Sequence, residues 1–366
     1  MQTIRELPKY PPAAIVRFFN ALRRRLSCIS NRFTHPNVLM LEKMQNLWLL
    51  GSVSVACQLG IADILKDGPK NIRELATLTG SVEDVLYRIM RLLASEGIFK
   101  ESGDRVFSNS SLSESMKETE LRYFIEHTLN SMQFRIFGDL MHSVKTGRRS
   151  SELFMEGEVF DFMRASEQRN ELYNKAMTNT SRMQIAAIFS AFDFSRYSHV
   201  VDIGGGRGLF LTALLEKNPH IKGTLFDLPQ VLEDKKTLSV NSTMNDRLTV
   251  IPGSFFDTIP EGGDLYTLKN ILHGWDDARA EKILNNIRNS VKCETRIMII
   301  EAVVGETNKQ SWAKASDIFM LAGVGGRERT EEEFRTLLQR AGFKIERVVD
   351  TVSPLSLIIA VPDLNN

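Results

Sequence analysis

Cysteines and long apolar runs are scarce in this 366-residue chain, and both absences argue against whole classes of protein. The three cysteines, Cys28, Cys57 and Cys293, lie far apart, and no CxxC pair occurs. We therefore expect neither a disulfide framework nor a zinc site, no bound metal, and a reducing, cytoplasmic location. No apolar run approaches the ~18 residues that a membrane-spanning helix needs, so stable membrane insertion is not expected.

A strong overall charge of either sign is also missing. The formal net charge is +1, from 46 basic and 45 acidic residues, so no global field attracts nucleic acid or a membrane. Hydrophobic residues make up 43% and charged residues 25%, which is typical of a globular protein. A chain of this length is long enough to form two domains with separate cores.

Acidic residues are absent from Leu7 to Leu41, a segment with six basic residues: Lys9, Arg17, Arg23, Arg24, Arg25 and Arg32. The stretch AAIVRFFNALRRRLSCI has apolar residues at helical spacing and a basic opposite face. Arginines interrupt its apolar part, which argues against a secretory signal. A transit peptide and a membrane-surface helix stay open as alternatives. We favour a basic helical arm, residues 1–38, that packs on a partner subunit.

Residues 39–115 are predicted to be helical apart from one short β-hairpin. We expect a long apolar helix from Met40 to Leu65, then two shorter helices and a hairpin that turns near Gly103. This order outlines a winged helix, which in isolation suggests DNA binding. The second short helix carries only Arg88 and Arg91 among several acidic and apolar residues, so we favour packing over DNA contact. Residues 116–195 are predicted to be a helical linker region.

From residue 196 to residue 366, short β-branched runs alternate with helical segments. The runs are HVVDIG, KGTLFD, LTVIPG, DLYTLKNI, RIMIIEAVV, FKIERVVDTV and LSLIIAVP. This alternation predicts a mainly parallel sheet covered on both faces, with the last two runs forming a hairpin at its edge. Ligands of such sheets bind beyond the carboxyl ends of the strands.

Three glycines, Gly204, Gly206 and Gly208, follow the first of these runs. A dinucleotide fingerprint would need a glycine where Leu209 stands, and the Gly-Lys-Ser/Thr of a phosphate-binding loop is absent. The glycines still allow a ligand to approach the main chain. Asp227 ends the second run, where a carboxylate can accept hydrogen bonds from both hydroxyls of a ribose.

His273 follows the fourth run, a position suited to proton transfer. A phenol, with a pKa of about 10, is mostly protonated at neutral pH, so a base with a pKa near 7 can take its proton during attack. Either Glu301 or Glu328 could accept the second ring N–H of the histidine and select its tautomer. The alternatives are a salt bridge of Glu328 with Arg327 or Arg329, and a structural His273.

Four segments in this order resemble the plant- and bacterial-type small-molecule O-methyltransferases: the loop from Asp202 to Gly208, FDLP, HGWDD and GGRERTEEEF. This class I, cation-independent family includes caffeate, hydroxyindole, anthracycline and phenazine O-methyltransferases, and the resemblance runs from Met40 to the C-terminus. It implies an α/β fold: a Rossmann-like methyltransferase domain with a mostly parallel seven-stranded sheet, preceded by a mainly helical, winged-helix-like dimerisation domain. It also implies S-adenosyl-L-methionine as cofactor and a homodimer.

The resemblance assigns roles to single residues. Catalysis would belong to His273, with Glu301 and Glu328 as its orienting partners. The cofactor would meet Gly204, Asp227, Leu228, Gly253, Ser254, Phe255 and Lys269. The acceptor pocket, to which the linker region contributes, would include Phe162, Met177, Asp317 and Met320. Two positions depart from the family pattern: Ser254 replaces an Asp that receives the adenine amino group in plant relatives, and Gly274 stands where many relatives carry Asp.

We therefore expect an S-adenosylmethionine-dependent O-methyltransferase that methylates a hydroxyl of an aromatic or conjugated small molecule of secondary metabolism, with His273 as general base. A non-methylating enzyme on the same scaffold (pericyclase, decarboxylase or hydroxylase) and an N- or C-methyltransferase are the alternatives. A non-catalytic regulator that reads cofactor level through the winged helix is a further alternative from a different class. No nucleic-acid partner is expected, because the second short helix is nearly neutral.

Overall fold

The computed structural model describes residue 11, residues 13–232 and residues 246–364, and the chain divides into two compact units. The sheet unit comprises residues 139–155 and 181–364 within this range, and the helical unit comprises residues 14–138 and 156–180. The predicted linker region, residues 116–195, therefore contributes segments to both units. Residues 1–10 of the predicted basic arm, Lys9 among them, lie outside the described residues.

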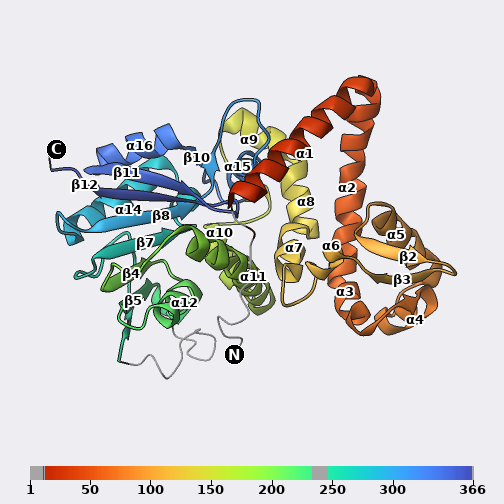
Figure 1. Ribbon diagram of the computed structural model, residues 1–366, viewed down its shortest axis with the longest axis horizontal. Helices are drawn as coiled ribbons and strands as arrows, with labels where there is room; N and C mark the ends of the chain where they lie inside the picture. Colours follow the sequence, from red (N-terminus) through yellow and green to blue (C-terminus); the bar gives the residue numbers. More distant parts are fainter. Residues whose placement is uncertain (1–10, 12, 233–245, 365–366) are drawn as a thin grey trace. The chain divides into compact units, whose positions relative to one another are not determined.

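The helical unit contains one small sheet among its helices (Figure 1). Its elements are α1 (Ala13–Phe33), α2 (Pro36–Gln58), α3 (Ile61–Ile64), η2 (Leu65–Asp67), β1 (Lys70–Asn71), α4 (Ile72–Thr79), α5 (Glu83–Ser95), β2 (Phe99–Ser102), β3 (Val106–Asn109), α6 (Ser111–Glu114), α7 (Arg122–Thr128), α8 (Ser131–Gly138), α10 (Val159–Arg164) and the first part of α11 (Glu167–Ala191). No single helix in the described part of the chain has the length and apolar content to cross a bilayer, although α2 with the segment Ile61–Asp67 passes that test as a bent pair.

The winged-helix outline is present in α4, α5 and the hairpin of β2 and β3, and β1 adds a third strand beside β3. The expectation of one helix from Met40 to Leu65 is wrong. Helix α2 begins at Pro36 and ends at Gln58, and α3 starts anew after Gly60. Gly60 has a φ of 66°, a left-handed conformation that breaks a helix and that glycine adopts without strain.

Helix α5 uses its apolar side for packing. Leu86, Met90 and Leu93 are buried in the core of the helical unit, whereas Arg88 and Arg91 are exposed on the same helix. Residues three and four apart share one side of a helix, so the leucines and the methionine form a single buried stripe. The packing surface predicted for this helix is thus its buried face.

The sheet unit alternates strands and helices. Its elements are α9 (Leu140–Thr146), η3 (Ser150–Leu153), the rest of α11, β4 (His199–Ile203), α12 (Leu209–Lys217), β5 (Lys222–Asp227), α13 (Pro229–Leu232), β6 (Leu248–Pro252), β7 (Leu265–Lys269), η5 (Leu272–Gly274), α14 (Asp277–Ser290), β8 (Arg296–Glu301), β9 (Val303–Val304), α15 (Trp312–Gly323), β10 (Arg329–Thr330), α16 (Glu331–Arg340), β11 (Phe343–Asp350) and β12 (Ser356–Pro362). The predicted runs of residues 199–304 and 343–362 all coincide with strands.

Seven strands form the main sheet in the order β11-β12-β8-β7-β4-β5-β6. The pairs from β8 to β6 are parallel, and β12 joins β8 and β11 antiparallel. The mostly parallel seven-stranded sheet and its edge hairpin are thereby confirmed. Figure 1 shows the strands side by side, with α14 and α16 lying along the sheet.

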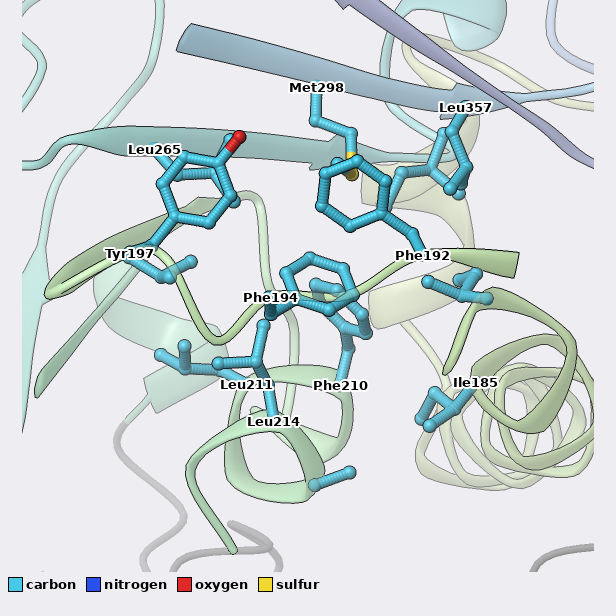
Figure 2. Close-up of a cluster of buried hydrophobic side chains, with 14 of the residues drawn as sticks. Ile185, Phe192, Phe194, Tyr197, Phe210, Leu211, Leu214, Leu265, Met298 and Leu357 are labelled. Carbon is cyan, nitrogen blue, oxygen red and sulfur yellow. The ribbon is translucent and has the colours of Figure 1, made fainter. Parts of the chain in front are cut away.

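Both faces of the sheet are buried, because side chains alternate between two hydrophobic clusters. Val200 belongs to the cluster that includes α12, and its neighbour Val201 belongs to the cluster that includes α14 and α16. Figure 2 shows the first cluster, where the ring centroid of Phe194 lies 4.9 Å from that of Phe192 and 6.1 Å from that of Phe210. A sheet covered on both faces leaves only its strand ends for ligands.

The strand order reverses direction beside β4. The chain passes from β4 to β5 and β6 on one side, and then returns to β7 on the other side of β4. In an open α/β sheet, ligands bind beyond the carboxyl ends of the strands at such a switch point. The residues that follow β4, β5 and β7 are therefore the ones to consider for chemistry.

Candidate active site

The loop after β4 owes its shape to glycine. Gly204, Gly206 and Gly208 have φ values of 64°, 59° and 76°, which side-chain-bearing residues rarely adopt. A Cβ on Gly204 would lie 2.4 Å from Ile271 Cδ1, so a side chain there would also displace the end of Ile271. A Cβ on Gly206 would meet nothing within 4 Å, so the main chain at that position faces open space.

Asp227, the last residue of β5, is tied to this loop. Its Oδ2 accepts a hydrogen bond from the Gly206 N–H at 2.7 Å, and its Oδ1 accepts one from the Leu228 N–H at 2.7 Å. These two bonds orient the carboxylate toward the glycine loop. Asp227, the residue predicted to bind a ribose, is therefore hydrogen-bonded to the glycine loop.

Two buried ionisable groups lie on the strands next to this loop. Asp202 Oδ1 accepts a hydrogen bond from Thr267 Oγ1 at 2.7 Å, and burial raises the pKa of Asp202 to about 6 against the opposing effects of that bond and of Lys269. Lys269 Nζ donates to Ser181 Oγ at 3.0 Å and to Gln184 Oε1 at 3.2 Å, and burial lowers the pKa of Lys269 to about 8. The sequence analysis assigned no role to Asp202. The pattern that could have indicated one is an acidic residue inside an apolar strand that ends at the glycine loop.

His273 lies in the short helix η5 after β7, between two buried glutamates. Its ring Nδ1 is 3.1 Å from Glu328 Oε1, whereas its main-chain N–H donates to Glu301 Oε1 at 3.1 Å. Glu328 is therefore the ring's partner, and Glu301 holds the backbone instead. Ser316 Oγ donates to the same Glu328 oxygen at 2.7 Å, which helps to orient the carboxylate.

These contacts change the proton affinity of the histidine. Burial lowers the pKa of His273, but the contact with Glu328 and the negative charges of Glu301 and Glu328 outweigh burial and raise it. The pKa of Glu301 is raised by burial first and by the charge of Glu328, with His273 opposing. The Oε2 atoms of both glutamates are buried without a hydrogen-bond partner among the described residues.

Arg329 connects the Glu328 segment to the His273 segment. Its side chain is fully buried, and it donates to Leu272 O at 3.1 Å, to Trp275 O at 3.0 Å and to Asp277 Oδ1 at 2.8 Å. Arg329 also pairs with Val303 in the parallel β9–β10 bridge, which places this segment beside the end of β8. The predicted alternative, a salt bridge between Glu328 and Arg329, is not formed, because Arg329 pairs with Asp277.

The main chain at Gly326 closes the same junction. Arg327 N–H donates to His273 O at 2.9 Å, and a Cβ on Gly326 would lie only 2.0 Å from that oxygen. The two segments can approach this closely only because residue 326 has no side chain. The side chain of Arg327 forms ion pairs with Asp277 and Glu333 and, like Arg329, does not pair with Glu328, which contacts His273.

Two comparisons by sequence and one by structure identify the family. Residues 137–344 match the O-methyltransferase domain, and residues 41–118 match the O-methyltransferase dimerisation domain. The chain is 33% identical over 332 residues to phenazine O-methyltransferase PhzM of Lysobacter antibioticus, covering 88% of this chain and 96% of that one. It is 34% identical over 312 residues to the mitomycin biosynthesis 6-O-methyltransferase of Streptomyces lavendulae, covering 83% and 88%.

The fold agrees with that match. CalO1, a methyltransferase in calicheamicin biosynthesis whose crystal structure is in an SAH-bound form, superposes with a TM-score of 0.80 at 29% identity, covering 89% of this chain and 98% of that one. The chain belongs to the O-methyltransferase family. It is an S-adenosylmethionine-dependent O-methyltransferase with a class I methyltransferase sheet and a helical dimerisation domain.

The glycine loop of this methyltransferase suits S-adenosylmethionine. The open main chain at Gly206 leaves room for a ligand, and Asp227 presents a carboxylate that can accept bonds from ribose hydroxyls. The buried acid Asp202 adds negative charge, which complements a sulfonium cation, next to the same loop. The residues present therefore fit the cofactor.

The third predicted cofactor segment lies after β6. A Cβ on Gly253 would meet the ring of Phe226 at 2.5 Å, and Ser254 Oγ accepts a hydrogen bond from Phe256 N–H at 3.2 Å. The ring of Phe255 packs edge-on against Phe256, with centroids 4.9 Å apart. Ser254 thus uses its hydroxyl to shape the turn.

The predicted acceptor-pocket residues are divided between the two units. Asp317 and Met320 lie on α15 in the sheet unit, and Asp317 Oδ1 accepts the Glu328 N–H at 2.9 Å. Asp317 therefore supports the Glu328 main chain. Phe162 and Met177 belong to the helical unit, where the ring of Phe162 lies 4.2 Å from the guanidinium carbon of Arg169. Their roles as pocket residues stay predictions.

Gly326→Ala should lower both stability and methyl transfer, because the new Cβ must push the His273 carbonyl away. We expect a cost of about 1–3 kcal/mol in unfolding free energy, the usual cost of overpacking. Gly274→Ala is the matched control, since a Cβ there would meet nothing within 4 Å. Thermal unfolding of the two variants measures the difference, and equal midpoints would contradict the close approach at Gly326.

Proposed function

We propose that this enzyme methylates a hydroxyl of an aromatic or conjugated small molecule and that His273 takes the proton of that hydroxyl. The observation that carries the proposal is the contact between His273 Nδ1 and the buried Glu328 carboxylate. A proton on Nδ1, directed at Glu328, leaves Nε2 as the basic nitrogen. The phenazine O-methyltransferase that this chain resembles supports an aromatic acceptor.

We infer that the cofactor is held by the residues after β4, β5, β6 and β7. The residues assigned to the cofactor are Gly204, Asp227, Leu228, Gly253, Ser254, Phe255 and Lys269. The bound S-adenosylmethionine supplies a methyl group on a positively charged sulfur. Asp227 would bind the ribose, and the Ser254 hydroxyl would accept a bond from the adenine amino group less strongly than an aspartate does.

The geometry around His273 supports the proposed proton step. The acceptor hydroxyl loses its proton to Nε2, which creates an imidazolium ring. Glu328 accepts the Nδ1–H throughout, and its charge together with that of Glu301 stabilises this ring. Glu301 is a positioning residue, because it holds the His273 main chain rather than the ring.

The helical unit is proposed to form the homodimer. Residues 41–118 match a dimerisation domain, and within them several large apolar side chains are exposed. They include Leu41, Met44, Leu47 and Trp48 on α2 and Val85 on α5. Burying such a surface against a second copy removes apolar area from water.

Four residues are proposed to contact the methyl acceptor: Phe162, Met177, Asp317 and Met320.

Incubation with S-adenosylmethionine labelled in its methyl group and a panel of phenols, hydroxyquinones and hydroxyindoles tests the substrate class. We expect label to enter a hydroxyl oxygen of at least one acceptor as a methyl ether. The matched amino compounds serve as the control. Transfer of label to nitrogen or carbon, or binding of the cofactor without any transfer, would contradict O-methylation.

His273→Ala should reduce kcat about 10²- to 10⁴-fold, the usual contribution of a general base, while cofactor affinity stays nearly unchanged. Asp227→Ala should leave kcat nearly unchanged but weaken cofactor binding, because it removes the carboxylate at the end of β5 that would accept the ribose hydroxyls. Calorimetric titration with the cofactor and single-turnover kinetics separate the two effects. A His273→Ala enzyme with full rate at neutral pH would refute the assignment.

Glu328→Gln should move the acid limb of the kcat/KM profile to lower pH. The pKa of His273 is raised above its ordinary value of 6.5, so the basic ring exists only above that raised pKa and activity is lost as the pH falls through it. Removing the Glu328 charge lowers the pKa and extends activity to more acidic pH. Glu331→Gln on the surface of α16 is the control, and an unshifted limb in Glu328→Gln would contradict the coupling.

A further inference from the structure

Helix α1 carries a regular apolar stripe that is open to water. Six side chains follow one another at alternating steps of four and three residues, a spacing that places them along one side of a helix. They are 40% to 86% exposed: Ile15, Phe19, Leu22, Leu26, Ile29 and Phe33. Phe18, 64% exposed, lies at the margin of the stripe. Figure 1 shows α1 and α2 as two long helices that meet at a bend.

The charged side chains of α1 all have the same sign. Arg23, Arg24, Arg25 and Arg32 are exposed, and no acidic residue occurs between Leu7 and Leu41. At ~100° per residue, Arg24 lies opposite the apolar stripe, whereas the other three arginines lie on its two flanks. Long side chains in these flanking positions can extend a charge away from an apolar layer while their stems stay in it.

This charge pattern does not suit a second copy of the helix. Two α1 stripes in contact would bring flanking arginines together, whereas paired helices use opposite charges at these positions. Helix α2 offers little compensation, because its one acidic residue, Glu42, is followed by Lys43. The dimerisation match also begins at residue 41, beyond α1. A nucleic acid would satisfy the arginines but leave the apolar stripe in water.

In place of the partner subunit favoured from the sequence, we propose that α1 binds an anionic phospholipid surface and lies in the plane of the membrane. The apolar stripe would enter the boundary between headgroups and acyl chains, and the arginines would meet the lipid phosphates. The near-neutral net charge of +1 means that this attraction is local to the helix. The remaining exposed apolar face, on α2, is left for the second subunit.

Sedimentation of the full chain with vesicles tests the proposal. Vesicles of equal parts phosphatidylserine and phosphatidylcholine should bind the enzyme at low salt, and vesicles of phosphatidylcholine alone should bind it much less. High salt should release the protein from the anionic vesicles, because ions screen the arginines. Equal binding to both vesicles, or none to either, overturns the proposal.

The triple change Arg23→Gln, Arg24→Gln and Arg25→Gln should weaken binding to the anionic vesicles about a hundredfold, since each basic residue near such a surface contributes about fivefold. The control removes the same charge from exposed arginines elsewhere, through Arg73→Gln, Arg91→Gln and Arg340→Gln. That control should bind as the parent does. An equal loss in both variants would mean that overall charge, not α1, causes the binding.

Phe19→Ser combined with Leu26→Ser tests the apolar stripe. Vesicle binding should be lost, while methyl transfer in solution and the dimer seen by size-exclusion chromatography stay unchanged. Circular dichroism and thermal unfolding verify that the variant is folded, as expected for two exposed positions. A variant that turns monomeric and keeps its vesicle binding would assign the stripe to a second copy and refute the lipid contact.

Discussion

The contact between His273 and Glu328 joins two segments that lie 55 residues apart in the chain, and the arrangement of the site depends on it. It forms because β9 pairs with β10, because Arg329 bonds the main chain around Trp275, and because Gly326 leaves room for the His273 carbonyl. None of these three features is itself a contact of the His273 ring. Each of them sets where a ring nitrogen and a carboxylate oxygen lie.

The burial of two carboxylates at the same junction is electrostatically unfavourable. Glu301 and Glu328 are both buried, and each has one oxygen without a hydrogen-bond partner in the described part of the chain. Burying carboxylates is unfavourable unless a positive group is near. A protonated His273 would be that group, so the arrangement favours the charged form of the ring. In the proposed mechanism, this stabilisation of imidazolium favours proton transfer from the acceptor hydroxyl to the ring.

The apolar surface of the helical unit falls into two parts with different surroundings. The exposed apolar residues of α2 from Leu41 onward belong to the segment that matches a dimerisation domain, and the proposed second subunit would cover them. The stripe on α1 lies before that segment, and the charged residues within Ala13–Phe33 are all arginines. Because hydrophobic burial is non-directional, the charges beside an apolar face decide which partner it takes.

The sequence alone determined the features that depend on short-range pattern. Alternating β-branched runs predicted the strands of the sheet, and the glycines after His199–Ile203 predicted an open loop, because strand period and backbone freedom are local properties. The break of the first long helix at Gly60 was missed, since a single glycine inside an apolar run gives a weak signal. Only the tertiary structure decided that Glu328 meets the ring of His273 while Glu301 holds its main chain. Glu301 ends β8 and Glu328 directly precedes β10, and the choice between them depends on the β9–β10 bridge and the buried Arg329, which bring these distant segments together.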